Sequence, residues 1–319
     1  MRQRILALSL ILACLILCSL AGCGQTPAEP SPPEKDVDIT EASAWIENAR
    51  VSYLGPEGTY TEEAARFFFQ SAGSFLPEST VEEAIADVVS GKADYAVIPQ
   101  ENTLGGAVTN YVDALIGQEG VYVVGEVILP ISQTLIAVPG ATLADIQTVC
   151  SHAQGIKQSQ VWRAEHLPEA ATEEMGSTAA AASYVAQQQD KSIAAIAAPA
   201  AAELYGLTVL AENVQITDAN KTRFYVLSAK ALSGDAQTQA VFVADCRASS
   251  LDDVIVEIHN MGLELVTIHD RPEGSALGSY HYIMEVEGAG GISAEQIKRI
   301  CSLEEIRFLG RFDPVEKGS

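Results

Sequence analysis

Patterns typical of strands and of helices alternate along the chain from Val51 to Leu227, and this alternation limits the fold more than any other feature. Apolar runs such as V-S-Y-L at residues 51–54 have the length of buried strands, and amphipathic stretches such as Val81–Ser90 favour helices. A regular alternation of the two is typical of an α/β sheet. The strand-like runs Tyr122–Val127 and Gln133–Ala137 are expected to carry the chain into a second lobe.

The order of the predicted elements changes after a linker of small residues at 228–237. Strands are expected at Ala240–Ala244, Glu264–Ile268, Ser279–Val286 and Ile306–Arg311, and helices at Ser250–Met261 and Ser293–Ile300. The order β-α-β-β-α-β is that of ferredoxin-like domains. The sequence therefore predicts an α/β domain at 49–230 and a separate small domain at 238–315, in line with the two domains that a length of 319 residues suggests.

The first residues have the composition of an export signal. Arg2 and Arg4 precede an apolar run, Ile5–Leu20, that is too short for a comfortable membrane span. The run ends in L-A-G-C, which resembles the lipobox of bacterial lipoproteins and implies that residues 1–22 are removed and Cys23 is lipidated. Several acyl chains together anchor a protein stably, so an extracytoplasmic, membrane-anchored lipoprotein is expected. The alternative is a plain signal peptide with an incidental cysteine.

Residues 23–48 are expected to form a flexible tether between the lipid and the folded part. Proline, glutamate and small polar residues dominate positions 24–38, which lack the apolar content to pack. A short helix at Thr40–Asn48 is expected to follow, with Thr40 as its N-cap.

Charge and cysteine spacing exclude several classes of function. A formal net charge of −23 repels phosphate backbones, so no nucleic-acid partner is expected. The cysteines beyond Cys23 are Cys150, Cys246 and Cys301, which are far apart and form no C-x-x-C pair. A zinc site or a disulfide framework is therefore not indicated, and buried free thiols or a single bridge remain.

The stretch N-K-T-R-F-Y-V-L at residues 220–227 combines groups that suit an anionic ligand. It reads as a loop that enters a strand, and it places the hydroxyl of Thr222 beside the permanent cation of Arg223. A planar guanidinium suits a carboxylate, which a small anionic substrate on an acidic protein would need. The alternative is an ordinary strand in which Arg223 is solvated or salt-bridged.

Polar residues also gather at three other predicted strand-to-helix junctions, where α/β proteins place binding sites. These are G-P-E-G-T-Y-T at 55–61 with Thr59, P-Q-E-N-T-L-G-G at 99–106 with Glu101, Asn102 and Thr103, and C-S-H-A-Q-G at 150–155 with Ser151, His152 and Gln154. The first junction would expose backbone N–H groups that attract anions. His152 could act as a general acid or base. Each junction has the alternative of a simple helix cap, with Thr61 as the cap in the first.

Together these motifs make the chain similar to the prephenate dehydratase family from about Val51 to Phe312. The shared motifs lie, in the family's order, at 55–61, 99–106, 151–155 (S-H-A-Q-G), 176–182 (G-S-T-A-A-A-A) and 220–224 (N-K-T-R-F). The resemblance implies a two-lobed catalytic domain like that of type II periplasmic binding proteins, followed by an ACT domain. It also implies conversion of prephenate to phenylpyruvate, in phenylalanine biosynthesis, by loss of water and carbon dioxide without a metal or an organic cofactor.

The resemblance carries residue roles with it. It implies that Thr222 is the residue most tied to catalysis, by hydrogen-bonding or protonating the departing ring hydroxyl. Arg223 is expected to bind a substrate carboxylate, and Glu101 to orient Asn102 or Arg223 or to act as an acid with a raised pKa. The substrate-binding residues are expected to be Thr59, Asn102, Thr103, Ser151, His152, Gln154, Asn220 and Phe224.

The C-terminal domain resembles the ACT domains of these enzymes, which implies a homodimer and phenylalanine as a ligand. Relatives that respond to phenylalanine carry G-A-L and E-S-R-P, whereas this chain has S-S-L at 249–251 and H-D-R-P at 269–272. The aligned regulatory positions are Leu251, Asp270, Arg271 and Pro272. The glycine that lets an amino-acid ligand approach the backbone is absent, which argues against inhibition by phenylalanine.

Two other functions fit the same motifs. An extracytoplasmic binding protein could capture a small carboxylate between two lobes of this kind, and a lipid tether would suit it. An arogenate dehydratase would act on a substrate that differs only by an amino group on the side chain. Formation of phenylpyruvate from prephenate would distinguish both from a prephenate dehydratase.

Overall fold

A computed structural model gives the fold, and it describes residues 47–70, 73–232, 234, 236–274, 277–303 and 305–318. The predicted signal peptide, Cys23 and the tether up to residue 46 lie outside the described residues. Of the expected helix Thr40–Asn48, only residues 47 and 48 are described, and they form a turn. Within the described ranges, no helix has the length and apolar character needed to cross a membrane.

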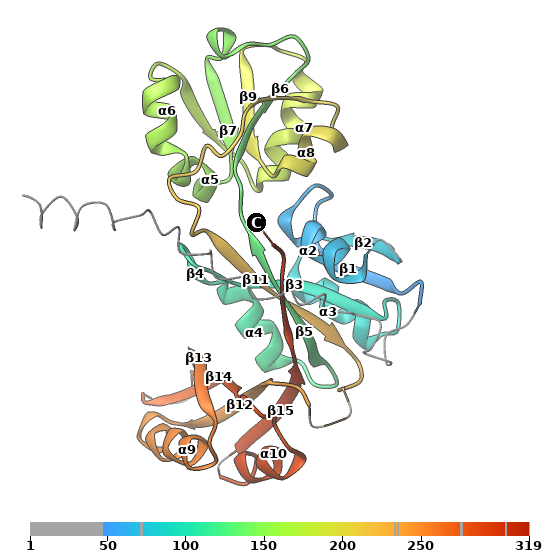
Figure 1. The fold of residues 1–319 in the computed structure, drawn as a ribbon, viewed down its shortest axis with the longest axis vertical. Coiled ribbons are helices and arrows are strands. Elements are labelled where there is room, and N and C mark those ends of the chain that lie inside the picture. Colours follow the sequence, from blue (N-terminus) through green and yellow to red (C-terminus); the bar gives the residue numbers. More distant parts are fainter. Residues whose placement is uncertain are drawn as a thin grey trace, which may run out of the picture. The chain divides into compact units, whose positions relative to one another are not determined.

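The first lobe is a mixed sheet with the strand order β2-β1-β3-β11-β5 (Figure 1). Its strands are β1 (Arg50–Leu54), β2 (Ser74–Glu78), β3 (Tyr95–Asn102), β5 (Tyr122–Pro130) and β11 (Lys221–Ser228), with β4 (Gly106–Ala107) beside β3. Its helices are α2 (Tyr60–Phe69), α3 (Val81–Val89) and α4 (Thr109–Gly117). Thr59 and Thr80 start α2 and α3, because their hydroxyls accept the free N–H groups of Glu62 and Glu83.

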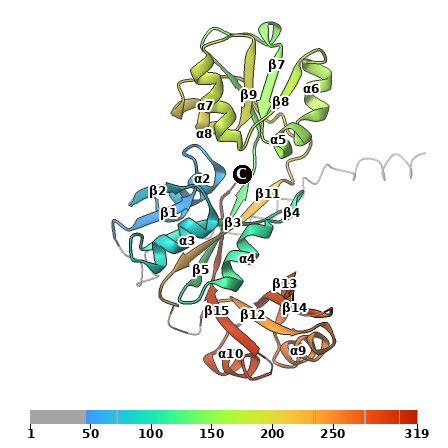
Figure 2. The same ribbon diagram turned by 180° about the vertical axis from the view of Figure 1, so that it is seen from behind.

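The second lobe is a five-stranded sheet with the order β8-β7-β9-β6-β10. Its strands are β6 (Thr134–Ala137), β7 (Thr148–Ser151), β8 (Ala171–Glu174), β9 (Ile193–Ala197) and β10 (Thr208–Ala211). Its helices are α5 (Ala153–Gln158), α6 (Gln160–His166), α7 (Thr178–Gln188) and α8 (Pro199–Leu204), with a 3-10 turn, η2 (Leu143–Asp145). The helix α6 lies on one side of this sheet, and α7 and α8 lie on the other (Figure 2).

The two lobes share one topology. In each, three parallel strands are followed by an inverted strand and then by a strand that is parallel to the first three. The inverted strand is in both cases the first one after the chain crosses between lobes, β6 after β5 and β11 after β10. The predicted α/β fold with two lobes is confirmed.

The C-terminal unit has the predicted ferredoxin-like topology. It contains β12 (Gln239–Arg247), α9 (Ala248–Asn260), β13 (Glu264–Pro272), β14 (Ser279–Glu287), α10 (Ala294–Ile300) and β15 (Glu305–Phe312). The strands form an antiparallel sheet in the order β13-β14-β12-β15. The helices α9 and α10 cover one face of this sheet (Figures 1 and 2), over a core that includes Phe242, Met284 and Val286.

The sequence suggested that this unit is separate, but the structure joins it to the first lobe. Val243 and Ile283 on the other face of its sheet share a core with Tyr111 and Leu115 of α4. The strand β15 joins β5 by one pair, Gly310 opposite Val123, and a Cβ atom at Gly310 would lie 2.1 Å from the Val123 carbonyl oxygen. After β15, β16 (Pro314–Glu316) also pairs with β5. The two sheets therefore form one continuous sheet.

Two stretches expected to be loops are strands. The strand β3 continues to Asn102, and β11 already begins at Lys221. The reason is that these ends pair with each other, with Thr222 opposite Asn102 and Arg223 opposite Glu101. The sequence also missed β2 and β8, which lie at sheet edges, where a proline or a run of polar residues is tolerated.

Candidate active site

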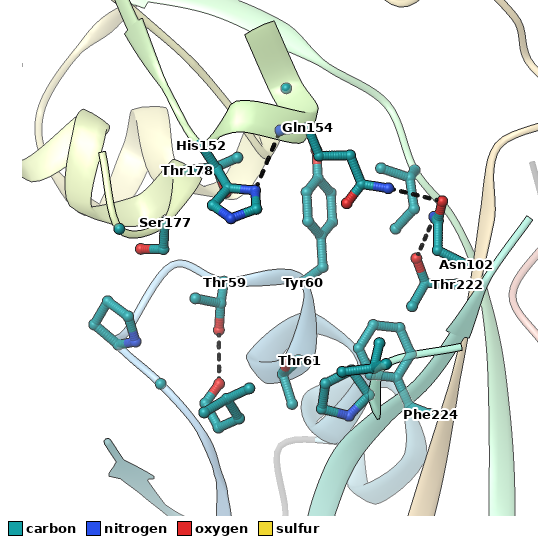
Figure 3. A pocket seen from close by; sticks show the side chains of 18 of the residues that line it. Thr59, Tyr60, Thr61, Asn102, His152, Gln154, Ser177, Thr178, Thr222 and Phe224 are labelled. Atoms are coloured by element: carbon teal, nitrogen blue, oxygen red, sulfur yellow. Dashed lines mark hydrogen bonds between the residues drawn. The ribbon is translucent and has the colours of Figure 1, made fainter. Parts of the chain in front are cut away.

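A cavity of about 880 Å³ is lined by residues of both lobes. The first lobe contributes the turn and start of α2 and the facing ends of β3 and β11, including Thr59, Asn102, Thr222 and Phe224. The second lobe contributes the starts of α5 and α7, including His152, Gln154, Ser177 and Thr178 (Figure 3). The structure therefore brings together the glycine-rich turn and the E-N-T, S-H-A-Q, G-S-T and T-R-F motifs.

Three helices begin at this cavity. The cap of α2 is Thr59 and not Thr61, and its Oγ1 accepts from Glu62 N at 3.4 Å. Ser177 caps α7 by accepting from Ala180 N at 2.9 Å. His152 caps α5, with Nδ1 accepting from Gln154 N at 3.4 Å, so the proton of a neutral His152 ring lies on Nε2. Free N–H groups and the positive ends of three helix dipoles thus meet at one place, which favours an anion.

The cavity lining has no cationic side chain of lysine or arginine among the described residues. Its acidic members are Glu57 and Glu78, and Glu78 is paired with Lys92 at 2.8 Å. An anionic ligand would therefore be held by neutral donors, namely backbone N–H groups, hydroxyls and amides, rather than by an ion pair.

Thr222 belongs to a row of side chains with fixed hydrogen bonds (Figure 3). Asn102 Nδ2 donates to Thr222 Oγ1 at 2.9 Å, and Asn102 Oδ1 accepts from Gln154 Nε2 at 3.0 Å. The backbone N–H groups of Leu104 and Gly105 also donate to Asn102 Oδ1, which fixes the orientation of the amide. Because Thr222 acts as the acceptor here, its own hydroxyl hydrogen is available to a ligand in the cavity.

Asn220 extends this row toward the second lobe. Its Oδ1 accepts from Asn102 Nδ2 at 2.8 Å, and its Nδ2 donates to Gln158 Oε1 at 3.0 Å. Gln133 Nε2 donates to the same Gln158 oxygen at 3.2 Å. Phe224, two residues after Thr222, is 2% exposed and lines the cavity with an aromatic ring. The row therefore connects β11 to α5 through buried amides.

Arg223 does not line the cavity, contrary to the prediction. Successive side chains of a strand point to opposite faces, so Thr222 and Phe224 face the cavity and Arg223 faces away. There it contacts Glu126 Oε2 at 2.5 Å, Glu101 Oε2 at 3.5 Å and Glu285 of the C-terminal unit. The salt-bridged alternative was correct for Arg223.

Glu101, Thr103 and Ser151 also lie outside the cavity lining. Glu101 pairs with Arg223, which agrees with one of the roles considered for it. Thr103 Oγ1 donates to Ala219 O and accepts from Lys221 N, both at 3.0 Å. Ser151 is fully buried at the end of β7 and donates to Ile196 O at 2.7 Å. Through these contacts, Glu101, Thr103 and Ser151 support the segments that carry the lining residues.

Several lining residues were not predicted as ligand contacts. They are Tyr60, Thr61, Gln133, Gln158, Ser177, Thr178 and Tyr205. Ser177 and Thr178 belong to the G-S-T motif at 176–182, which is the signal that could have found them. Gln158 ends α5 and Gln133 precedes β6, and nothing in their local sequence distinguishes them from surface glutamines.

The four positions aligned with regulatory motifs lie on the C-terminal unit. Leu251 is part of α9 and packs half-buried against the core of that unit. Arg271 on β13 donates to Asp113 of α4 at 2.8 Å. Asp270 and Pro272 are exposed at the end of the same strand. Cys150 and Cys246 are buried, and Cys301 is half-buried.

The acid cluster around Arg223 predicts how stability depends on pH. Burial, and then the charge of Glu285, raises the pKa of Glu126 to about 7 from a usual 4.5. The folded state thus binds a proton that the unfolded state has lost, so this contribution to stability is complete below pH 4.5 and is lost as pH rises toward 7. Relative to Glu126→Gln, the wild type should lose on the order of 3 kcal/mol of unfolding free energy between pH 4.5 and 8. Urea unfolding of both proteins at several pH values measures this, and parallel curves would contradict it.

Comparison with known proteins identifies the family. The prephenate dehydratase family model matches residues 51–232. A prephenate dehydratase from Amycolatopsis methanolica is 33% identical over 276 residues, which are 83% of this chain and 88% of the relative. A crystal structure of prephenate dehydratase from Arthrobacter aurescens, in complex with L-Phe, is 30% identical with a TM-score of 0.75, over 83% of this chain and 90% of that chain. A structure described as a novel type of quorum quenching acylase is 26% identical with a TM-score of 0.73, over 83% and 98%. The chain therefore belongs to the prephenate dehydratase family.

Proposed function

We propose that the cavity between the lobes binds prephenate and converts it to phenylpyruvate. The observation that carries this proposal is the placement of Thr222, whose hydroxyl accepts from Asn102 and faces a cavity where three helices begin. Membership of the prephenate dehydratase family supports the same activity, that of a hydro-lyase.

The donors around the cavity suit the two carboxylates of prephenate. The starts of α2, α5 and α7 offer backbone N–H groups, and Thr59, Ser177 and Thr178 add hydroxyls. Such donors bind anions without a cationic side chain. The aromatic ring of Phe224 and the side chains of Leu54, Val108 and Ile131 offer apolar surface for the ring of the substrate.

The reaction itself asks little of the protein beyond orientation and one hydrogen bond. The bond between the ring carbon and its carboxylate breaks, its electron pair completes the aromatic ring, and the bond to the ring hydroxyl breaks. Carbon dioxide leaves, and the departing hydroxide takes up one proton to become water. Thr222 O–H can donate to that oxygen while Asn102 N–H stabilises the charge that develops on Thr222 Oγ1. Holding the ring so that both groups leave together supplies the rest.

The test is to incubate the purified protein with prephenate and measure phenylpyruvate. We expect turnover without added metal or cofactor. Binding of prephenate by calorimetry without turnover would instead favour a small-carboxylate binding protein. Faster formation of phenylalanine from arogenate than of phenylpyruvate from prephenate would make the protein an arogenate dehydratase.

We further propose that the ferredoxin-like unit at 238–315 is an ACT domain and that the protein is a homodimer. The strand order supports the first part, and the relative from Arthrobacter aurescens was solved with L-Phe. The missing glycine near Leu251 argues that phenylalanine does not inhibit this protein. Adding phenylalanine to the turnover assay tests regulation, and sedimentation tests the dimer; strong inhibition or a monomer would reject the respective part.

The proposed location is extracytoplasmic, with the protein anchored to a membrane by lipid on Cys23. The apolar segment 5–20 and the L-A-G-C sequence support it. Incorporation of a labelled fatty acid that is lost in Cys23→Ser would agree with this location. Equal labelling of both proteins would reject it.

A further inference from the structure

The C-terminal unit reaches the catalytic strand through one buried carboxylate. Glu285 lies on β14, between Met284 and Val286, which point into the unit's own core. Because side chains alternate along a strand, Glu285 points the other way, toward the first lobe. It is 0% exposed, and it forms an ion pair with Arg223 of β11.

Glu285 contacts more than the guanidinium. Tyr225 OH donates to Glu285 Oε2 at 2.7 Å, and Gln100 Nε2 donates to the same oxygen at 3.3 Å. Gln100 Nε2 also donates to Tyr225 OH at 2.9 Å. Glu285 thus holds two residues of β11 and one of β3. These are the strands that present Thr222 and Asn102 to the cavity.

The position of Gln100 gives this contact a specific consequence. The pairing of β11 with β3 shifts between Arg223 and Phe224, because Arg223 lies opposite Glu101 and Phe224 opposite Pro99. Gln100 is therefore the extra residue of a β-bulge. Bulges re-aim the side chains next to them and are common beside active sites. Here only the pair of Glu101 and Arg223 separates the bulge from the pair of Asn102 and Thr222, whose side chains are joined at 2.9 Å.

We propose that Glu285 is a positioning residue for the dehydratase site: through Arg223, Tyr225 and Gln100 it fixes the bulge that brings Asn102 to Thr222. The proposal rests on the proposed function, and it assigns a task in catalysis to a residue of the C-terminal unit. Glu285 lies in that unit and reaches the substrate only through the side chains that it holds.

The other acids around Arg223 cannot replace Glu285 in this task. Glu126 on β5 and Glu101 on β3 both pair with Arg223, so the guanidinium keeps counter-charges when Glu285 becomes neutral. Within the described part of the chain, Gln100 and Tyr225 hydrogen-bond to Glu285 and to neither of the other two acids. Loss of the Glu285 charge therefore weakens the hydrogen bonds that hold the bulge, without leaving Arg223 unpaired.

The test compares Glu285→Gln with Asp113→Asn in the full-length protein. Asp113→Asn breaks the pair between Arg271 and α4, which also joins the C-terminal unit to the first lobe but is exposed. We expect Glu285→Gln to lower kcat about tenfold with KM changed less than about twofold, since misplacing a reacting group lowers the rate more than binding. Asp113→Asn should leave both constants unchanged. A wild-type kcat in Glu285→Gln, or an equal loss in Asp113→Asn, would overturn the proposal.

Hydrogen exchange supplies a readout that does not need turnover. Backbone amides of residues 221–225 and 100–102 should exchange faster in Glu285→Gln than in the wild type, and at the wild-type rate in Asp113→Asn. Unchanged exchange in Glu285→Gln would overturn the positioning role even if prephenate is not the substrate. Failure of the wild type to turn over prephenate would reject the proposed function alone.

A second variant covers the case in which Glu285→Gln does not fold. Tyr225→Phe removes the hydrogen bond to Glu285 Oε2 and leaves every charge of the cluster in place. The same change in kcat and in exchange, smaller in size, is expected. Its absence would overturn the proposal as well.

Discussion

We expect Thr222→Val to lower kcat by about 10³-fold and to leave the fold intact. Valine keeps the β-branched shape on β11 but removes the hydroxyl that faces the cavity, so position 222 can no longer donate to the departing oxygen. Steady-state kinetics with prephenate measures the effect, and the thermal unfolding midpoint checks the fold. Removing a hydroxyl that accepts from Asn102 leaves one amide hydrogen without that partner, so only a small loss of stability is expected.

Two matched variants make the result specific. Thr222→Ser restores the hydroxyl and should recover most of the activity. Thr208→Val makes the same chemical change on the exposed strand β10 and should have no effect. A Thr222→Val protein with more than about a tenth of the wild-type kcat would remove Thr222 from the chemical step.

Arg223→Met should lower the unfolding free energy by about 3–5 kcal/mol, because it leaves buried carboxylates without their cation. Glu126 is 1% exposed and Glu285 is fully buried, and both contact the guanidinium. Urea unfolding at pH 7 measures the loss. A substrate-binding arginine would behave differently, with a higher KM and unchanged stability.

A triple variant separates loss of the pair from loss of packing. Replacing Arg223 with Met together with Glu126→Gln and Glu285→Gln removes the uncompensated charges, and stability should return to within about 1–2 kcal/mol of the wild type. If Arg223→Met unfolds at the wild-type midpoint, the cluster does not stabilise the fold. If the triple variant is no more stable than Arg223→Met, the loss comes from packing and not from charge.

The architecture could be predicted because the local patterns agree with the fold. Alternating strands and helices gave the two lobes, and the order of six elements gave the ferredoxin-like topology. The edge strands β2 and β8 escaped detection because a strand at a sheet edge needs little apolar sequence. The joining of the C-terminal unit to the first lobe was not predicted either. It depends on contacts between residues far apart in the sequence, such as Gly310 and Val123.

The site could be predicted to the level of motifs but not of side-chain direction. Thr222, Asn102, Gln154 and Thr59 were assigned to one site from four separate stretches, and all four line one cavity. The sequence predicts Arg223 on the wrong side because the pattern at 220–223 is that of a loop, in which neighbouring side chains can point the same way. Once Thr222 and its neighbour belong to one strand, they must face opposite sides of the sheet.

The inverted strand β11 determines when the first lobe can close during synthesis of the chain. In the first lobe, β11 lies between β3 and β5. β5 begins at Tyr122 and β11 begins at Lys221, more than ninety residues later in the chain. The place between β3 and β5 therefore stays empty until β11 has been made. A nascent chain that has not reached Lys221 exposes two long unpaired edges to its neighbours in the cell. The strand that closes this gap is the one that carries Thr222, so the cavity lining is completed in the same step that closes the first lobe.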